Sequence, residues 1–241
     1  MARRRFFVDE VRGGKAKVAG DEAHHLTRVL RVEPGQKYEI SDNRSAYLAE
    51  VESARKDLVT FLVLDRLADE APLLRTVVYA SLIRFERFEL LLEKATELGA
   101  SRIVPVQAER SEKGLDRAAL KRLPRWQRIV REAAEQSRRT QIPVIDEPVR
   151  LLSIVQAPHD WRLLLDEERS SPGILQVLSA ALLRGSEPAI LAGPEGGWND
   201  RERASLMDAG WRAVSLGPSI LRAETAVIAA LAVLNAAAIG A

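Results

Sequence analysis

The 241-residue chain has no cysteine and only three histidines, His24, His25 and His159. Without cysteine the chain has no disulfide framework, no thiolate zinc site and no cysteine nucleophile. His24 and His25 are adjacent, so on a helix they would point in different directions and could not share a metal ion. We therefore expect no metal centre and a chemistry that depends on other side chains.

Long hydrophobic runs are also missing. The longest, residues 225–239, is shorter than the roughly 18 residues of a membrane span, rich in alanine and interrupted by Asn235. It predicts a buried helix. The segment MARRRFFVDEVR at residues 1–12 has a basic cluster but lacks the apolar stretch of a secretory signal. The expectation is a soluble, cytoplasmic protein without a membrane partner.

The chain has little net charge, because 36 Lys and Arg face 34 Asp and Glu and leave +2. This balance hides a local excess of +6 in residues 102–139, against −4 in residues 140–241. Such an excess attracts phosphate groups at short range. The basic stretch ends in Arg138 and Arg139. It predicts an RNA-contacting surface or a solvated helix with cations at its C-terminal end, where the helix dipole favours them.

Residues 3–66 predict a small β-barrel. Partly alternating apolar, β-branched and aromatic residues indicate short strands at 3–8, 15–19, 37–41, 46–51 and 57–64. Residues 21–31 instead have helical spacing, which would place Arg28 and Arg31 on one face, where they could bind a phosphate together. The segment 68–72, Ala-Asp-Glu-Ala-Pro, predicts a linker.

Beyond the linker, strands and helices alternate. Strands are predicted at 75–82, 102–106, 143–146, 162–165, 189–192 and 212–216. Helices are predicted at 88–98, from about Pro124 to Arg138, and after Trp198, where Asn199 and Glu202 have the spacing of a capping box. This alternation predicts a mostly parallel sheet covered on both faces, with ligands at the carboxyl ends of its strands.

Two segments at predicted strand ends could carry chemistry. AGPEGGWND, residues 192–200, has three glycines and a proline in a row of five, so its backbone can turn sharply and approach a ligand. It is neither a P-loop nor G-x-G-x-x-G, and an ordinary tight turn has the same pattern. In SLGPSILRAETAVIAAL, residues 215–231, Glu224 suits the start of a helix, but the cation of Arg222 does not.

Six segments in chain order between residues 3 and 226 resemble the bacterial 16S ribosomal RNA (uracil-N3) methyltransferases of the SPOUT superfamily. They are RRRFF, HHLTRVLRVEPGQ, EKATELGASRIVPVQAERS, EAAEQSRRTQIPVI, LAGPEGGW and SLGPSILRAETA. The resemblance implies a PUA-like RNA-binding β-barrel at residues 1–70. It also implies a SPOUT methyltransferase domain at residues 73–241, an α/β fold with a mostly parallel sheet and a trefoil knot.

The resemblance further implies a function. The chain would use S-adenosyl-L-methionine to methylate N3 of a specific uridine in 16S ribosomal RNA. Its partners would be that RNA or the small ribosomal subunit, and a second copy of the chain in a homodimer. The sequence departs from the family pattern at Ser219, where relatives have a basic residue, and at Ala223, where they have threonine.

The resemblance also suggests roles for individual residues. Arg222 would stabilise the uracil anion, and Glu195 or Glu224 would act as the base. The predicted cofactor contacts are Leu165, Leu191, Gly193, Glu195, Gly196, Gly197, Leu216, Gly217, Ile220, Leu221 and Thr225. The predicted RNA contacts are Arg4, Arg5, Arg28, Arg31, Arg110 and Arg139.

Two other classes of protein remain as alternatives. A nucleotide-dependent oxidoreductase would need G-x-G-x-x-G after a strand and an acidic residue about 20 positions later, and this fingerprint is missing. A non-enzymatic RNA-binding or ribosome-assembly protein would suit the barrel and the arginines, but would leave the glycine-rich strand ends without a purpose. Binding of S-adenosylmethionine, of a dinucleotide or of neither distinguishes the three.

Overall fold

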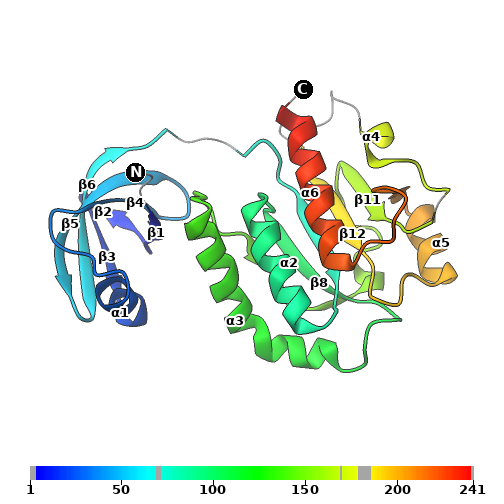
Figure 1. Ribbon diagram of the computed structural model, residues 1–241, viewed down its shortest axis with the longest axis horizontal. Coiled ribbons are helices and arrows are strands. Elements are labelled where there is room, and N and C mark those ends of the chain that lie inside the picture. Colours follow the sequence, from blue (N-terminus) through cyan, green and yellow to red (C-terminus); the bar gives the residue numbers. More distant parts are fainter. Residues whose placement is uncertain (1–3, 69–71, 169, 179–185, 240–241) are drawn as a thin grey trace. The chain divides into compact units, whose positions relative to one another are not determined.

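The computed structural model describes residues 4–68, 72–168, 170–178 and 186–239 (Figure 1). The chain divides into two compact units, one formed by Met1–Ala71 with Ala134–Ile142 and the other by Pro72–Ala133 with Pro143–Ala241. The short segment 134–142 thus belongs with the N-terminal residues. The predicted boundaries, 1–70 and 73–241, instead place this segment in the C-terminal domain. Residues 69–71 of the predicted linker lie outside the described residues.

The first unit contains a six-stranded sheet in the order β1-β4-β5-β6-β3-β2. Its strands are β1 (Arg5–Phe7), β2 (Val11–Arg12), β3 (Lys15–Ala19), β4 (Lys37–Ser41), β5 (Ala46–Arg55) and β6 (Leu58–Arg66). β1 and β4 are parallel and the other pairs antiparallel. The β5–β6 register shifts at Leu48/Ala49 and at Val51/Ser53, and such irregularities bend a strand. The expected barrel is therefore a curled sheet, with β1 and β2 at its two edges.

The core of the first unit combines the inner face of this sheet with one helix, α1 (Gly20–Arg28). Ala23 and Leu26 of α1 are buried against the strands. The predicted helix is confirmed, but it ends at Arg28, and Arg31 has a left-handed backbone with a φ of 52°. The prediction that Arg28 and Arg31 share a helix face is therefore wrong.

The second unit contains a parallel sheet in the order β10-β8-β7-β12-β11-β13, with β9 also paired to β8. Its strands are β7 (Val77–Ser81), β8 (Arg102–Gln107), β9 (Val144–Ile145), β10 (Val149–Arg150), β11 (Trp161–Leu165), β12 (Pro188–Ala192) and β13 (Arg212–Val214). All residues of β7 and β12 are buried, as expected for parallel strands covered on both faces. The predicted α/β architecture is confirmed.

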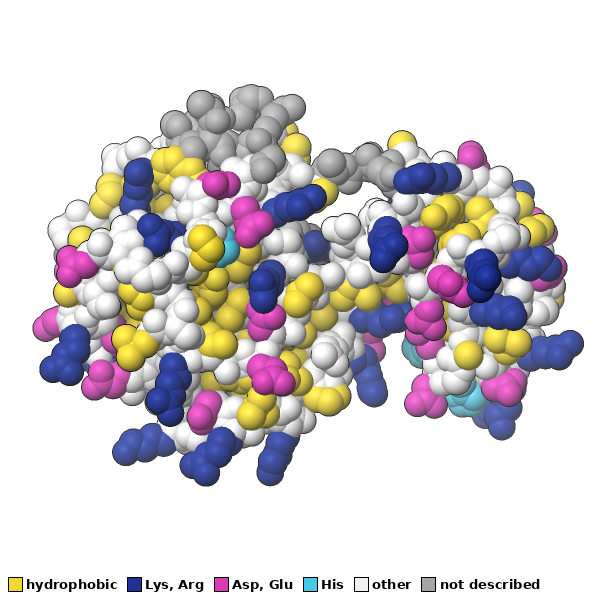
Figure 2. Space-filling view, turned by 180° about the vertical axis from the view of Figure 1, so that it is seen from behind, with side chains coloured by type: hydrophobic (Ala, Val, Ile, Leu, Met, Phe, Trp, Pro, Cys, Tyr) yellow, Lys and Arg dark blue, Asp and Glu magenta, His cyan; other side chains and the backbone are white. Residues whose placement is uncertain are grey.

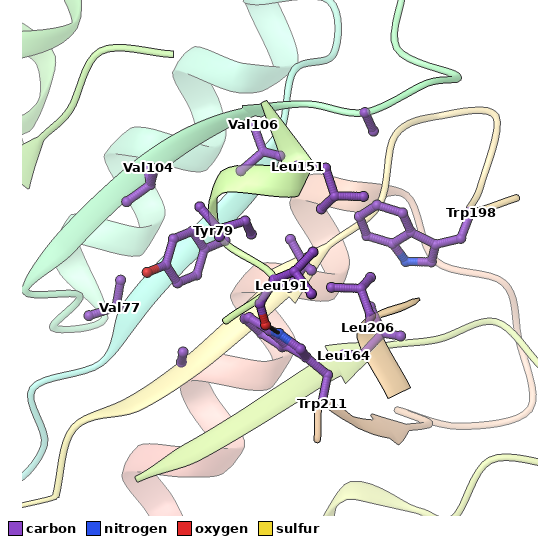
Figure 3. Close-up of a cluster of buried hydrophobic side chains, with 14 residues drawn as sticks. Val77, Tyr79, Val104, Val106, Leu151, Leu164, Leu191, Trp198, Leu206 and Trp211 are labelled. Atoms are coloured by element: carbon purple, nitrogen blue, oxygen red, sulfur yellow. Dashed lines mark hydrogen bonds between the residues drawn. The ribbon is translucent and has the colours of Figure 1, made fainter. Parts of the chain in front are cut away.

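Helices cover both faces of this sheet. On one face α6 (Ala223–Ile239) contacts β12 and β7, and α2 (Phe85–Glu97) contacts α6. On the other face, the short 3-10 helix η1 (Leu151–Ser153) and α5 (Asp200–Asp208) complete a cluster of buried side chains (Figure 3). A short helix, α4 (Ile174–Val177), follows β11. In the described residues, no helix is both long and apolar enough to cross a membrane.

The helix predicted from about Pro124 begins earlier, because α3 spans Leu115–Gln136 and contains Pro124 in its interior. A proline inside a helix removes one backbone hydrogen bond and kinks the helix, and Figure 1 shows a bend in α3. Proline is therefore not at the first turn here. The remaining 21 residues and the packing of Trp126 on Phe85 and Phe88 hold the helix together across it.

Candidate active site

The carboxyl ends of three adjacent strands, β12, β11 and β13, surround a cavity of about 710 Å³. The loop after β12 supplies residues 193–195, 197 and 198, the end of β11 and the loop after it supply 165–167, and the segment after β13 supplies 215–223. The parallel sheet brings these three loops together, since all of its strands end at the same edge.

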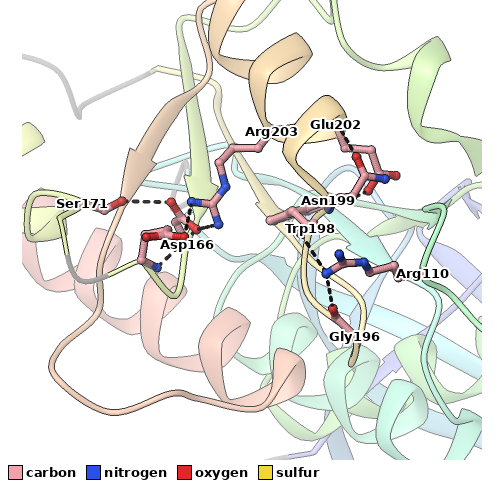
Figure 4. A network of polar contacts seen from close by, with 9 residues as sticks. Arg110, Asp166, Ser171, Gly196, Trp198, Asn199, Glu202 and Arg203 are labelled. Atoms are coloured by element: carbon pink, nitrogen blue, oxygen red, sulfur yellow. Dashed lines mark hydrogen bonds and ion pairs between the residues drawn. The ribbon is translucent and has the colours of Figure 1, made fainter.

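The glycine-rich loop after β12 is held in place on both sides. Gly197 donates a backbone hydrogen bond to the Pro194 carbonyl at 2.9 Å and has a φ of +67°, which favours glycine. Arg110, in the loop after β8, donates through Nη1 to the carbonyl oxygens of Gly196 at 3.0 Å and Trp198 at 3.2 Å (Figure 4). These hydrogen bonds define the shape of the loop.

The capping box predicted at the start of α5 is confirmed. Asn199 Oδ1 accepts from the Glu202 amide at 2.8 Å, and Glu202 Oε2 accepts from the Asn199 amide at 3.3 Å. The same two side chains bind the loop after β8, because Asn199 Nδ2 donates to Glu109 Oε2 at 2.7 Å and the Glu109 amide donates to Glu202 Oε1 at 2.8 Å. One cap thus fixes two strand-end loops relative to each other.

A carboxylate network forms another wall of the cavity. Asp166 pairs with Arg203 of α5 at 2.8 Å and accepts from the Ser171 hydroxyl at 2.9 Å (Figure 4). Beside it lies Glu167, whose Oε1 would be 2.6 Å from a Cβ atom placed on Gly197. A side chain at position 197 would therefore displace the Glu167 carboxylate and strain the left-handed backbone.

Two arginines face this cavity in different ways. Arg87 of α2 forms an ion pair with Glu195 through Oε1 at 2.5 Å. Arg222 lines the cavity and is exposed, and its guanidinium has no hydrogen bond or ion pair with any described residue. Its carbonyl accepts from the Ala226 amide at 2.8 Å, so Arg222 lies at the N-terminus of α6, where the helix dipole disfavours a cation.

Most of the predicted site residues meet at this cavity. Those that line it are Leu165, Gly193, Glu195, Gly197, Leu216, Gly217, Ile220, Leu221 and Arg222. Four others lie elsewhere. Leu191 is buried in the core, Gly196 contacts Arg110, Thr225 points to solvent from α6, and Glu224 is only 6% exposed. Glu224 Oε2 has no hydrogen-bond partner in the described residues.

Sequence reasoning missed three charged residues of this cavity: Arg87, Asp166 and Glu167. Asp166 and Glu167 could have been found, because they directly follow a predicted strand, where functional residues of parallel sheets gather. Arg87 had no such signal, since it lies inside a helix and reaches the cavity through its pair with Glu195. In the part of the chain that the structure describes, no cluster of three or more His, Asp or Glu could hold a metal ion.

The arginines predicted to contact RNA differ in their exposure to solvent and in their contacts within the protein. Arg4, Arg28 and Arg31 are exposed. Arg5 instead pairs with Glu39 at 2.8 Å and donates to the Arg138 carbonyl and to Thr140. Burial lowers the pKa of Arg139 to about 10.

The charges of the basic stretch 102–139 are also partly engaged within the protein. Arg102 pairs with Asp146, and Arg122 and Arg125 pair with Glu89, whose pKa is lowered mainly by the hydrogen bond from Arg125. Both carboxylates lie outside the stretch. On the face seen in Figure 2, basic and acidic side chains are interspersed. The local excess of +6 is thus not a measure of free positive charge.

Comparison with known proteins decides the family. Residues 69–235 match the family model described as RNA methyltransferase domain, and residues 18–64 match the RNA methyltransferase PUA domain. The chain belongs to the RNA methyltransferase family. The resemblance in the sequence is therefore confirmed, and the curled sheet of the first unit corresponds to a PUA domain.

Similar members of this RNA methyltransferase family share most of their length with this chain. Ribosomal RNA small subunit methyltransferase E of Bacillus subtilis is 33% identical over 227 residues, covering 90% of this chain and 88% of the relative. That of Mycobacterium tuberculosis is 35% identical over 237 residues, covering 94% and 88%. The crystal structure of the Neisseria gonorrhoeae protein of the same name, bound to S-adenosyl methionine, is 29% identical, with a TM-score of 0.86 and 98% of each chain covered.

Proposed function

We propose that this chain transfers a methyl group from S-adenosyl-L-methionine to N3 of a specific uridine in 16S ribosomal RNA. The cavity at the ends of β11, β12 and β13, in a chain of the RNA methyltransferase family, carries this proposal. Support comes from the relatives, which are named ribosomal RNA small subunit methyltransferase E, and from the Neisseria gonorrhoeae structure, which contains S-adenosyl methionine.

The cavity fits such a cofactor in size and chemistry. Its volume of about 710 Å³ is within the range of small-molecule sites. Leu165, Leu216 and Leu221 supply apolar surface for an adenine ring, while the glycine-rich loop after β12 presents backbone groups. When bound, S-adenosylmethionine supplies a methyl group that its sulfonium already activates for transfer.

The protein then has to align the acceptor and remove its proton. The N3–H of uracil is a weakly acidic imide, so methylation forms the N3–carbon bond and breaks the sulfur–carbon bond while the N3 proton leaves. We assign Arg222 to stabilise the negative charge that develops on the uracil, because its guanidinium has no partner in the described residues. Glu195 accepts the proton, and the buried Glu224 is the second candidate for this role.

RNA binding in this proposal begins on the first unit, where Arg4, Arg28 and Arg31 are exposed. Their contacts with phosphates would give salt-dependent affinity. The target base has to be unstacked before it can reach a cavity at the strand ends. Arg5 and Arg139, which are engaged or buried within the first unit, would support this RNA-binding surface, and Arg110 would order the glycine-rich loop of the second unit.

Further parts of the proposal concern the whole protein. The chain acts as a homodimer, the segments around residues 193–222 form a trefoil knot, and the protein works in the cytoplasm, where its ribosomal substrate is. Analytical ultracentrifugation tests the dimer: a species of twice 26.7 kDa is expected, and a monomer at assay concentrations contradicts it.

The direct test of function is mass spectrometry of 16S ribosomal RNA from cells with and without this protein. We expect 3-methyluridine to be absent at one position without the protein and to be restored by purified protein with S-adenosylmethionine. Calorimetry of ligand binding distinguishes the three classes of protein. A methyltransferase binds S-adenosylmethionine, an oxidoreductase would bind a dinucleotide, and a non-enzymatic RNA-binding protein would bind neither ligand. An unchanged methylation pattern contradicts the proposal.

A further inference from the structure

A second cavity of about 340 Å³ lies on the other side of the glycine-rich loop. It is formed at the carboxyl ends of β7, β8 and β12. Ile83 and Arg84 follow β7, Ser111 and Glu112 follow β8, and Glu195 and Gly196 follow β12. In the strand order β8-β7-β12-β11-β13, the two cavities thus lie on the two sides of the β12 loop, and Glu195 lines both of them.

The two neighbouring glycines of this loop face opposite cavities. A Cβ atom on Gly197 would be 2.6 Å from Oε1 of Glu167, which lines the first cavity. A Cβ atom on Gly196 would be 3.2 Å from Cβ of Arg110, which lines the second. The backbone of this loop therefore separates the two cavities. The missing side chain of Gly197 leaves space on the side of the first cavity, and that of Gly196 leaves space on the side of the second.

The walls of the second cavity suit a single nucleotide. The partly exposed Leu115 offers apolar surface for the edge of a base, above the buried Leu82 and Ile83. The exposed Glu112 and the backbone of Gly196 offer polar groups. A volume of about 340 Å³ is at the lower end of small-molecule sites, as expected for a pocket that takes one extruded base.

Arg84 adds a free cation at the rim of this cavity. It is exposed, and its guanidinium has no hydrogen bond or ion pair with any described residue, whereas Glu195 and Glu89 are paired with other arginines. Arg84 is also the N-cap residue of α2, where a cation is unfavourable. The carbonyl of Arg84 accepts from the Arg87 and Phe88 amides at the start of α2, but its guanidinium remains available for an anionic group such as a phosphate.

We propose that this second cavity receives the target nucleotide of the RNA, with Arg84 holding its phosphate. The inference rests on the proposed methyl transfer and extends it. It selects Glu195 as the proton acceptor, because Glu195 alone lines both cavities and only its Oε1 is engaged by Arg87. Glu224 lines neither cavity.

The test compares R84A with R201A, since Arg201 is an exposed arginine on α5 that lines neither cavity. For R84A we expect kcat/KM for the small ribosomal subunit to fall about 10- to 100-fold, the effect of losing one charge-assisted contact. The Kd for S-adenosylmethionine, measured by calorimetry, should stay within about twofold of the wild-type value. R201A should leave both quantities unchanged.

A second pair of variants tests the separation of the two cavities. G196A should displace Arg110 by a few tenths of an ångström at the second cavity and lower kcat/KM while cofactor binding persists, whereas G197A should weaken cofactor binding by displacing Glu167. Thermal unfolding confirms that each variant is folded.

The outcomes separate this inference from the function on which it rests. If the wild-type protein methylates the subunit but R84A behaves like R201A, or if G196A weakens cofactor binding as G197A does, the second cavity is not the nucleotide site. If the wild-type protein does not methylate the subunit at all, the proposed function itself fails.

Discussion

At the scale of single residues, Arg222 offers the sharpest prediction. We expect R222A to lower kcat about 10²- to 10³-fold, as removal of one group that stabilises developing charge does in other enzymes. The free energy of unfolding should stay the same or rise by about 0.3–1 kcal/mol, because the cation at the N-terminus of α6 is removed. Single-turnover kinetics and urea unfolding measure the two effects, with R201A as control. An R222A enzyme with wild-type turnover would remove Arg222 from the mechanism.

The sequence allowed us to predict which residue types lie at the strand ends. It did not allow us to predict which predicted site residues form hydrogen bonds or ion pairs within the protein. The sequence identified Arg222 correctly as a cation in an unfavourable place at a helix start, because capping preferences are local. It could not distinguish the exposed Arg4 from Arg5, whose Glu39 and Thr140 partners lie 34 and 135 positions away. Partners so distant in sequence leave no trace in the spacing of the residues.

At the scale of elements, the Asn199 cap connects helix stability to the site. N199A removes the acceptor of the Glu202 amide and the donor to Glu109, so the free energy of unfolding should fall by about 1–2 kcal/mol. N199S restores the cap alone and should recover most of this loss. Urea unfolding followed by tryptophan fluorescence reports on the second unit, because all four tryptophans, Trp126, Trp161, Trp198 and Trp211, lie in it. Equal stability of N199A and wild type would contradict this role of the cap.

Elements with a strong local pattern were predicted well, and the exception is informative. Most strands of both sheets and the start of α5 follow from alternation, apolar runs and capping spacing, whereas the two-residue strands β2 and β10 were not predicted. The start of α3 was misplaced because Pro124 was interpreted as a first-turn residue, whereas the helix accommodates it with a bend. The packing of Trp126 on Phe85 and Phe88, which favours the longer helix, involves residues far apart in sequence.

At the scale of the whole molecule, the segment 134–142 belongs to the first unit, although the residues before and after it in the sequence belong to the second. Domain boundaries predicted as continuous stretches of sequence cannot detect such a segment. The chain leaves the second unit at Ala133, joins the first unit, and returns at Pro143. The hydroxyl of the buried Ser41 donates to the Thr140 carbonyl at 2.6 Å, and the Ile142 amide donates to Asn43 Oδ1 at 2.7 Å. These contacts cross about a hundred positions of sequence, so a boundary drawn at residue 70 separates groups that bind each other.

The contact between Asn43 and Ile142 allows this grouping to be tested in the intact chain. Asn43 has a left-handed backbone with a φ of 65°, so N43G keeps the conformation and removes only the acceptor, while N43D keeps an acceptor oxygen. Losing the hydrogen bond lowers the local opening free energy by about 0.5–1.5 kcal/mol, so the Ile142 amide should exchange about 2- to 10-fold faster in N43G. Native-state hydrogen exchange measures this rate, and N43D should resemble the wild type. If exchange at Ile142 does not change in N43G, the segment 134–142 is held by the helix that precedes it and not by the N-terminal strands.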